Sequence, residues 1–143
     1  MFKKFWNRSR KYKASNSMES MLENGVYQAD PKSFFGEFSR QQIVVLASVS
    51  DNDRISFETT TPLDGVSYIF AYTSAQALAH TLEMKNLGVQ KTAEITGGDL
   101  INILLSSNLG MQINAEIYDD PVLCKPENLE YIAEQLNLPK NRK

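Results

Sequence analysis

The sequence predicts a single α/β (α+β) domain in which helices pack on one mixed β-sheet. Three observations carry this prediction. Apolar residues recur at helical spacing in several segments, β-branched or alternating apolar runs lie between them, and the 143 residues are 42% hydrophobic and 22% charged, as in compact domains with one core. We place the domain at residues 16–139, between a basic aromatic N-terminal tail (1–15) and a basic C-terminal tail (140–143).

Two helices are expected first. Asn16 with Glu19 three residues later makes a capping-box-like start. The residues after it that share one helical face are Met18, Met21, Leu22, Gly25 and Val26. Asp30 before Pro31 marks a second start, because proline at the first helical position loses no hydrogen bond. Phe34, Phe35 and Phe38 would be the buried residues of this second helix.

Three strands and a helix follow. Residues 42–49 form a β-branched apolar run typical of a strand covered on both faces. Residues 55–59 alternate, which favours an antiparallel partner, and 66–72 form a third strand after a turn. Thr73 and Gln76 are spaced as a capping box for a helix through about Glu83. A short strand is expected near 90–95.

The last part alternates helix and strand. Thr96 and Asp99 lie at capping-box spacing before an apolar helix that ends near Asn108. Residues 111–117 alternate as a strand with one polar face, a turn at Asp119 and Asp120 follows, and 122–124 continue as strand. Pro126 starts a final helix, expected to end before Pro139. Its apolar stripe is Leu129, Ile132, Ala133 and Leu136.

Charge is distributed unevenly along the chain. Residues 1–13 carry six basic residues and no acid, and residues 140–143 carry three more. The middle holds the other six basic residues against all 17 acidic ones, a net charge of −11. A body of this sign repels phosphate backbones, so we expect no nucleic-acid partner for it.

Catalytic and metal-binding sets are scarce. Cys124 is the only cysteine and His80 the only histidine, which leaves neither a disulfide nor a zinc tetrad. Asp51 and Asp53 begin like a calcium loop, but Ser56 stands where that loop needs glycine, so we interpret them as a hairpin turn. We therefore expect no cofactor, no metal and no enzymatic activity. With no apolar run long enough for a membrane span, the expected location is the cytoplasm.

One candidate anion or loop site is Gly97, Gly98 and Asp99, at a helix start where free N–H groups can hold an anion. No lysine follows the glycines, as a Walker loop requires, and the spacing does not fit a dinucleotide fingerprint. A structural turn is the alternative that we favour. The minority hypothesis is an anion-binding or enzymatic domain that uses this start, or the end of the 66–72 strand, as the floor of its pocket.

The N-terminal tail is the candidate interaction segment. It interleaves aromatic residues with cations, and its candidate residues are Lys3, Lys4, Phe5, Trp6, Arg8, Arg10 and Lys11. Three interpretations stay open: a tail without fixed contacts or folded back on the acidic body, a weak contact of residues 1–13 with an anionic membrane or a protein, or stacking on nucleic acid. The second would place the protein at the inner face of the membrane.

Short motifs from Tyr68 onwards resemble the N-terminal domain of the SseB family, bacterial proteins named for enhanced serine sensitivity. A strand enters a helix through Tyr72, Thr73 and Ser74, Gly98-Asp99-Leu100 opens an apolar helix, and Leu109-Gly110 leads into a strand. The helix that begins Pro126-Glu127 closes the domain, and the likeness covers residues 16–137. Asn114, Ala115 and Glu116 replace the family's Asn-Pro-Gly turn. The resemblance implies an α/β domain that binds proteins, and it transfers no catalytic residue.

The sequence thus predicts a non-enzymatic cytoplasmic protein-interaction domain of SseB-like type, associated with secretion or stress. An acidic body would steer a basic partner towards itself. A more specific hypothesis is a small immunity or inhibitor protein that covers a basic toxin. We make no prediction of oligomeric state.

Overall fold

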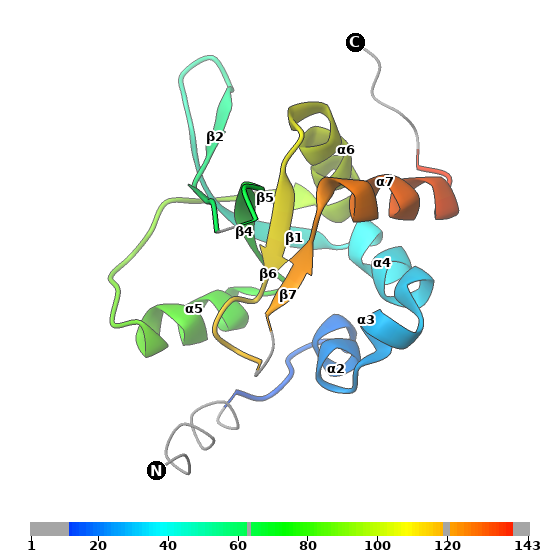
Figure 1. Cartoon of the computed structure of the whole chain (residues 1–143). Coiled ribbons are helices and arrows are strands. Elements are labelled where there is room, and N and C mark those ends of the chain that lie inside the picture. The colour runs from blue at the N-terminus through cyan, green and yellow to red at the C-terminus, as the bar shows by residue number, and fades with distance from the viewer. Residues whose placement is uncertain (1–11, 63, 119–120, 139–143) are drawn as a thin grey trace.

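The computed structural model describes residues 12–62, 64–118 and 121–138, which fold as one sheet with helices on both faces (Figure 1). The helices are α2 (Ser17–Glu23), α3 (Val26–Ala29), α4 (Pro31–Arg40), α5 (Ala75–Met84), α6 (Gly97–Ser107) and α7 (Pro126–Gln135). The strands are β1 (Gln42–Val49), β2 (Ile55–Phe57), β3 (Thr59–Thr60), β4 (Tyr68–Tyr72), β5 (Thr92–Thr96), β6 (Gly110–Ile113) and β7 (Val122–Cys124). The predicted α+β class is confirmed.

The sheet has seven strands and mixed direction. β1 pairs antiparallel with β2, β4 and β5, β3 pairs antiparallel with β4, and β6 pairs antiparallel with β7. Among the strands of the described ranges, only β4 and β6 run parallel, with Ile69 opposite Met111 and Ala71 opposite Ile113. The segment between them carries α5, β5 and α6. The carboxyl ends of β4 and β6 therefore meet at one edge of the sheet, where ligand sites of α/β proteins often lie.

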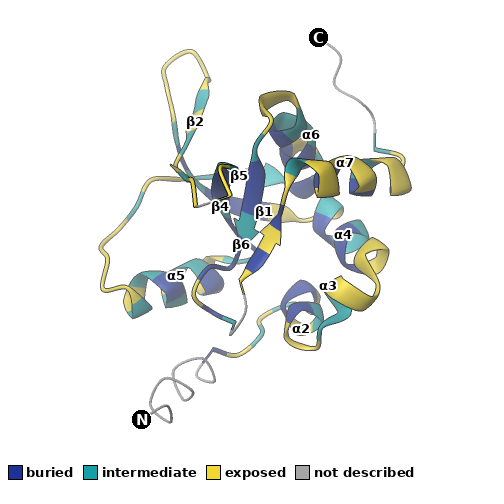
Figure 2. Ribbon diagram, viewed as in Figure 1, coloured by how far each residue is buried: buried dark blue, intermediate teal, exposed yellow. Residues whose placement is uncertain are grey.

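The two faces of the sheet are covered differently. Ile43, Val45 and Ala47 of β1 belong to the main core, which α2, α4, α6 and α7 complete. Val44, from the same strand, points into a smaller cluster with Tyr72 and Ala77, on the face that α5 covers. Figure 2 shows the central strands buried and the outer sides of the helices exposed. The prediction that the first strand is covered on both faces is confirmed.

Helix α4 supplies the aromatic part of the core. Asp30 caps its first turn, with its carboxylate accepting from the backbone N–H of Ser33 at 3.3 Å, and Pro31 is the first helical residue. Phe34, Phe35 and Phe38 are all buried, and the first two rings meet edge to face with centroids 4.8 Å apart. The predicted helix start and buried face are both confirmed.

Two helix ends differ from the expectation. The spacing predicts Gly25 on the buried face of the first helix, but its φ of 75° is left-handed, so α2 ends at Glu23 and a separate helix, α3, begins at Val26. The cap of α5 is Ser74, not Thr73: the Ser74 hydroxyl accepts from the N–H of Ala77 at 3.0 Å. Thr96, expected to cap α6, makes no side-chain capping bond.

The expected strand over 111–117 is also shorter than predicted. β6 ends at Ile113, because Asn114 and Glu116 take left-handed φ angles of 53° and 69°. Ala115 and Ile117 are nevertheless buried, so their alternation reflects burial in a turn and not a strand. The expected turn at 119–120 and the expected helix stop at Pro139 lie outside the described residues.

Candidate functional site

A groove of about 470 Å³ runs between α6 and α7. Its apolar lining comes from Leu105, Pro126 and Ala133. Its acidic lining comes from Glu127, Glu130 and Glu134, which follow one another on α7 at intervals of three and four residues and so share a face of the helix. Leu129 and Ile132 occupy the opposite, buried face of α7. The same periodicity that anchors the helix in the core thus lines the groove with carboxylates.

The groove is electrostatically one-sided. Among the described residues that line it there is no lysine or arginine; the remaining ones are Asn102, Ser106 and Asn108. The described residues form one ion pair, between Arg40 and Glu37 at 2.9 Å, and neither residue lines the groove. No described cation therefore pairs with the three glutamates of the groove. Exposed carboxylates without a bound cation give this face a negative potential that attracts basic groups.

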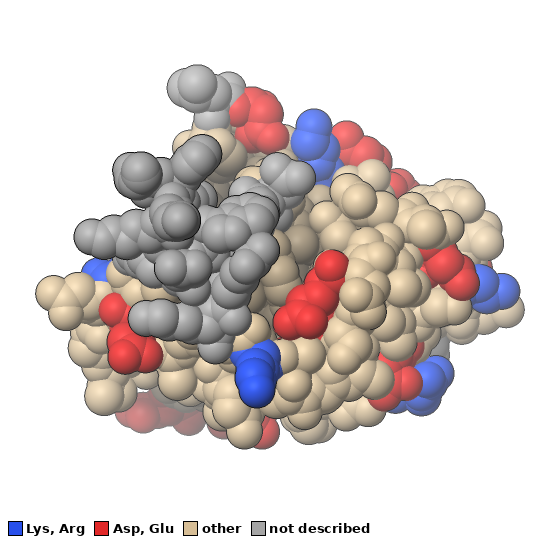
Figure 3. All heavy atoms as spheres, turned by 90° about the horizontal axis from the view of Figure 1, so that it is seen from below, with Lys and Arg blue, Asp and Glu red and all other residues tan. Residues whose placement is uncertain are grey.

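The described part of the chain is acidic elsewhere too. It contains 15 of the 17 acidic residues and seven of the 15 basic ones. Figure 3 shows a different face, where acidic side chains lie singly over the surface and basic side chains lie close to some of them. The groove differs from that face because its three carboxylates follow one helix without a basic residue in the lining.

A second polar site is buried under α2. Glu19 has no exposed surface, and one of its carboxylate oxygens accepts from the Tyr12 hydroxyl (2.5 Å), the Ser15 N–H (2.8 Å) and the Ser15 hydroxyl (3.0 Å). The other oxygen accepts from the hydroxyls of Thr73 and Ser74, both at 2.6 Å. Five donors thus surround a buried carboxylate that forms no ion pair with a described cation. We call this set the Glu19 cluster.

The Glu19 cluster lies at the carboxyl ends of the two parallel strands. Thr73 follows β4, and its N–H donates to the Asn114 side-chain oxygen at 3.0 Å just beyond β6. The Asn114 amide nitrogen returns hydrogen bonds to the Thr73 hydroxyl (2.8 Å) and to the Tyr118 hydroxyl (3.2 Å). The side chains of Thr73, Asn114 and Tyr118 are therefore joined by hydrogen bonds to one another.

The electrostatics of Glu19 follow from these contacts. Burial is the largest single influence and raises its pKa, but the hydrogen bonds from Ser74, Thr73, Tyr12 and Ser15 together outweigh it and hold the pKa below its ordinary value of 4.5. Burial and the bond to Glu19 raise the pKa of Tyr12. The carboxylate is thus kept ionised and saturated with donors, as in a structural anchor and not in a general acid or base.

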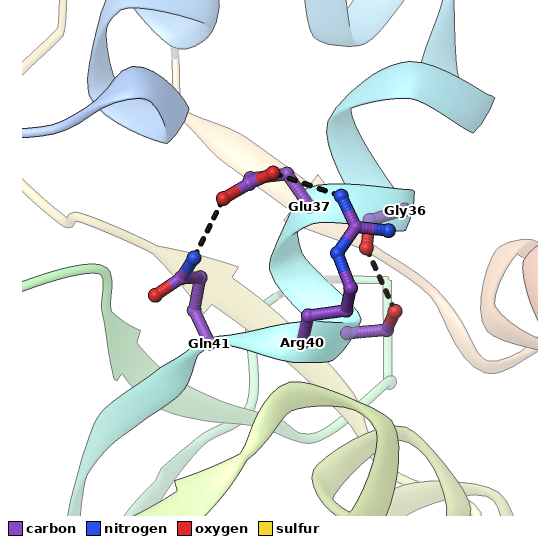
Figure 4. Close-up of polar contacts among 5 residues, drawn as sticks. Gly36, Glu37, Arg40 and Gln41 are labelled. Atoms are coloured by element: carbon purple, nitrogen blue, oxygen red, sulfur yellow. Dashed lines mark hydrogen bonds and ion pairs between the residues drawn. The ribbon is translucent and has the colours of Figure 1, made fainter.

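The Gly97–Asp99 candidate sits where α6 packs on the end of α4. A Cβ on Gly97 would lie 2.0 Å from the backbone oxygen of Phe38, and the Gly97 N–H already donates to the Gln41 carbonyl at 2.9 Å. Figure 4 shows this end of α4, where Glu37 accepts from Arg40 (2.9 Å) and from Gln41 (2.6 Å). The close approach of two backbones accounts for the glycine, and Asp99 is exposed.

His80 and Cys124 do not form a catalytic pair. Cys124 is buried in the main core, where burial raises the thiol pKa to about 12, whereas His80 lies on α5 across the sheet. The His80 ring is 5.1 Å from that of Tyr12, and its Nε2 is buried with no hydrogen-bond partner. Burial lowers the His80 pKa, against the opposing effect of Glu83. No cluster of three or more potential metal ligands occurs in the described ranges.

Asp51 and Asp53 occupy the turn between β1 and β2, as interpreted from the sequence. Asp53 has a left-handed φ of 61° and its N–H donates to the Ser50 carbonyl at 2.9 Å. The tail candidates, Lys3 through Lys11, and the basic residues 140–143 lie outside the described residues. In the part of the chain that the structure covers, no helix combines the length and apolarity needed to cross a membrane.

Sequence reasoning missed both the groove and the Glu19 cluster. The spacing of Glu127, Glu130 and Glu134 was visible, but only the tertiary packing of α6 beside α7 turns it into one wall of a groove. The sequence alone presents Glu19 as a helix-capping residue. Its backbone N–H does donate to Asn16 at 3.0 Å, whereas its carboxylate reaches residues more than 50 positions away.

Comparison of the chain with protein-family models, with curated proteins and with solved structures finds no match.

Proposed function

We propose that this chain is a non-enzymatic protein-interaction domain that binds a basic segment of a partner protein in the groove between α6 and α7. The observation that carries the proposal is the row of Glu127, Glu130 and Glu134 along a groove whose described lining contains no lysine or arginine. The membership of an SseB-like family and a role in secretion or stress remain predictions from the sequence motifs.

The groove suits lysine and arginine side chains in particular. These residues pack their aliphatic stems on apolar surface while their charged heads contact carboxylates. Leu105, Pro126 and Ala133 offer such surface beside the three glutamates. Complementary charge also accelerates encounter and suppresses acidic competitors, and both effects weaken as salt is added.

An immunity or inhibitor protein that covers a basic toxin is the more specific version of this proposal. It requires the same acidic surface and adds only that binding masks the toxin's own site. The test below uses a defined peptide, so it addresses the basic-partner proposal directly and does not depend on the identity of the toxin.

The experiment is a fluorescence-anisotropy titration of a labelled helix-forming peptide of lysine and leucine with the full chain. The test variant carries Glu127→Gln, Glu130→Gln and Glu134→Gln. The matched control carries Glu23→Gln, Glu83→Gln and Glu94→Gln, which are exposed acids on α2, α5 and β5. Both variants lose the same formal charge, so a difference between them reports position and not net charge.

We expect the groove variant to bind about tenfold more weakly than the native chain, as for the loss of three exposed ion pairs. The control variant should stay within about twofold, and added salt should weaken native binding. An equal loss of peptide affinity in the two variants would mean that net charge alone determines binding, and would contradict the proposal. Unchanged peptide affinity in both variants would contradict it as well.

A further inference from the structure

The connection between α5 and β5, residues 85–91, exposes apolar side chains at its tip. Val89 is 99% exposed and Leu87 is 50% exposed, with Gly88 between them. Figure 1 shows this connection running along the outside of the molecule, away from the sheet. A fully exposed valine next to a half-exposed leucine loses the burial that aliphatic side chains otherwise gain.

The loop is held firmly at both ends. Asn86 takes a left-handed φ of 57°, and the Leu87 N–H donates to the Leu82 carbonyl at 2.8 Å, which closes the end of α5. At the other end, the Lys91 carbonyl accepts from the Ala47 N–H of β1 at 3.1 Å. The fold therefore presents Leu87 and Val89 outward from two fixed points.

The charges around the tip have one sign. Lys85 and Lys91 flank it, both are exposed, and no acidic residue occurs between Glu83 and Glu94. No ion pair joins either lysine to another described residue. In a chain whose described part is mostly acidic, this is a local reversal of charge that accompanies the exposed aliphatic residues.

Helix α5 also contacts the first residue of the described chain, Tyr12. The Tyr12 ring lies 5.1 Å from that of His80 on α5, and the Tyr12 hydroxyl donates to the Glu19 carboxylate. In the sequence, the eleven residues before Tyr12 include Phe2, Phe5 and Trp6 and five cations. The α6–α7 groove lies on the opposite face of the sheet from α5.

We infer that the α5–β5 loop is a docking site for an anionic lipid bilayer, with Leu87 and Val89 entering the interface and Lys85 and Lys91 contacting the headgroups. This goes beyond the proposed binding of a basic protein and uses another face of the domain. Charge complementarity favours a bilayer because short aliphatic side chains flanked by lysines satisfy both its apolar boundary and its negative surface.

The basic aromatic residues 2–11 precede Tyr12 in the sequence and could supply a second attachment to the same bilayer. A single weak insertion gives only marginal membrane binding, and two signals together give stable binding. With the α5–β5 loop on the bilayer, the acidic groove, which lies on the opposite face of the sheet from α5, faces away from an anionic surface that would otherwise repel it. A bound domain would thus keep its groove open to a partner.

The test is co-sedimentation of the full chain with vesicles of phosphatidylcholine containing phosphatidylserine, compared with phosphatidylcholine alone. The apolar variant is Leu87→Ser with Val89→Ser. Its matched control is Val49→Ser with Leu123→Ser, which removes two exposed aliphatic residues (53% and 42% exposed) elsewhere. A third variant is Lys85→Gln with Lys91→Gln. Far-ultraviolet circular dichroism confirms that each variant is folded before binding is compared.

We expect the native chain and the control to pellet with anionic vesicles and not with neutral ones. The apolar variant should bind about tenfold more weakly, and the lysine variant should lose about fivefold for each lysine. If the apolar variant binds anionic vesicles as tightly as the native chain, attachment is due to residues 1–11 alone and the loop site is overturned. Absence of native binding to anionic vesicles would overturn it as well.

A label at the loop tip gives a second readout that does not depend on affinity. In V89C, a thiol-reactive, environment-sensitive dye labels the introduced cysteine selectively, because Cys124 is buried and its thiol pKa is raised to about 12. Anionic vesicles should shift the dye emission to shorter wavelength. An unshifted emission at saturating lipid would show that the tip stays in water and would contradict insertion.

Discussion

The hydroxyl of Thr73 donates a 2.6 Å hydrogen bond to the carboxylate of Glu19, which stands 54 residues earlier in the chain. This bond joins α2 to the turn between β4 and α5, where the Ser74 hydroxyl donates to the same carboxylate oxygen at the same distance. A carboxylate without exposed surface normally needs a cation, and here neutral donors take that role. The position of α2 on the sheet therefore depends on Glu19.

Replacement of Glu19 by glutamine should destabilise the fold by about 3 kcal/mol, because one acceptor oxygen becomes an N–H₂ group that faces hydroxyl donors. The free energy of unfolding from urea titration, followed by circular dichroism, measures this loss. Glu23→Gln, an exposed change on the same helix, is the control and should stay within about 0.5 kcal/mol. A loss for Glu19→Gln no larger than that of the control would contradict the anchoring role.

Acid should weaken the Glu19 anchor. The pKa of Glu19 is lower in the folded chain than its ordinary 4.5, so the unfolded chain binds the proton more readily. The stability that this shift contributes is complete above pH 4.5 and is lost as the pH falls through the folded value. The difference in unfolding free energy between the native chain and Glu19→Gln should therefore narrow below pH 4.5. A difference that stays constant into that range would contradict the pKa direction.

His80 should cause a loss of folding stability that begins at a higher pH than the loss due to Glu19. Burial lowers its pKa below 6.5, so unfolding takes up a proton and stability declines as the pH falls from 6.5. Urea midpoints measured across this window should fall for the native chain and less for His80→Gln, which cannot take up the proton. Parallel pH profiles for the two proteins would contradict the lowered pKa of His80.

Local signals explain which elements were predictable. The Asp30-Pro31 start and the apolar run of β1 act within a few residues, and both were predicted with their observed bounds or close to them. The end of β6 was not predictable in this way. Ala115 and Ile117 are buried and alternate with polar residues, although Asn114 and Glu116 have left-handed backbone conformations that end the strand. Periodicity reports burial, and here a turn satisfies the same pattern as a strand.

The two adjacent glycines at the start of α6 should respond differently to alanine. A Cβ at Gly97 would meet the Phe38 carbonyl oxygen at 2.0 Å, a backbone atom that cannot rotate away, so Gly97→Ala should cost at least about 3 kcal/mol. At Gly98 the nearest atom is 3.4 Å away and alanine favours the helix, so Gly98→Ala should be neutral within about 0.5 kcal/mol. Thermal unfolding compares them, and similar effects would contradict this packing.

Cys124 should be inert in the folded protein. Its thiol is buried and its pKa is raised to about 12, so little thiolate is present at mildly alkaline pH. A chromogenic disulfide reagent should therefore react slowly with the native chain and rapidly after guanidinium denaturation. Rapid stoichiometric reaction of the native chain would mean that β7 opens readily or that the thiol is accessible.

The candidate site was less predictable than the fold. An overall acidic body was apparent from composition, but the groove needs α6 and α7 side by side, and the Glu19 cluster needs Thr73 and Asn114 brought together by parallel strands. Contacts across such separations leave no local pattern. The sequence therefore predicts the charge of a partner more readily than the place where that partner binds.

Backbone amide shifts recorded by NMR during titration with the lysine-leucine peptide test the groove assignment most directly. The account predicts shifts concentrated on residues of α6 and α7 around Asn102, Ser106, Glu130 and Glu134, which fade as salt is added. Shifts spread evenly over the acidic surface, or centred on another element, would contradict it.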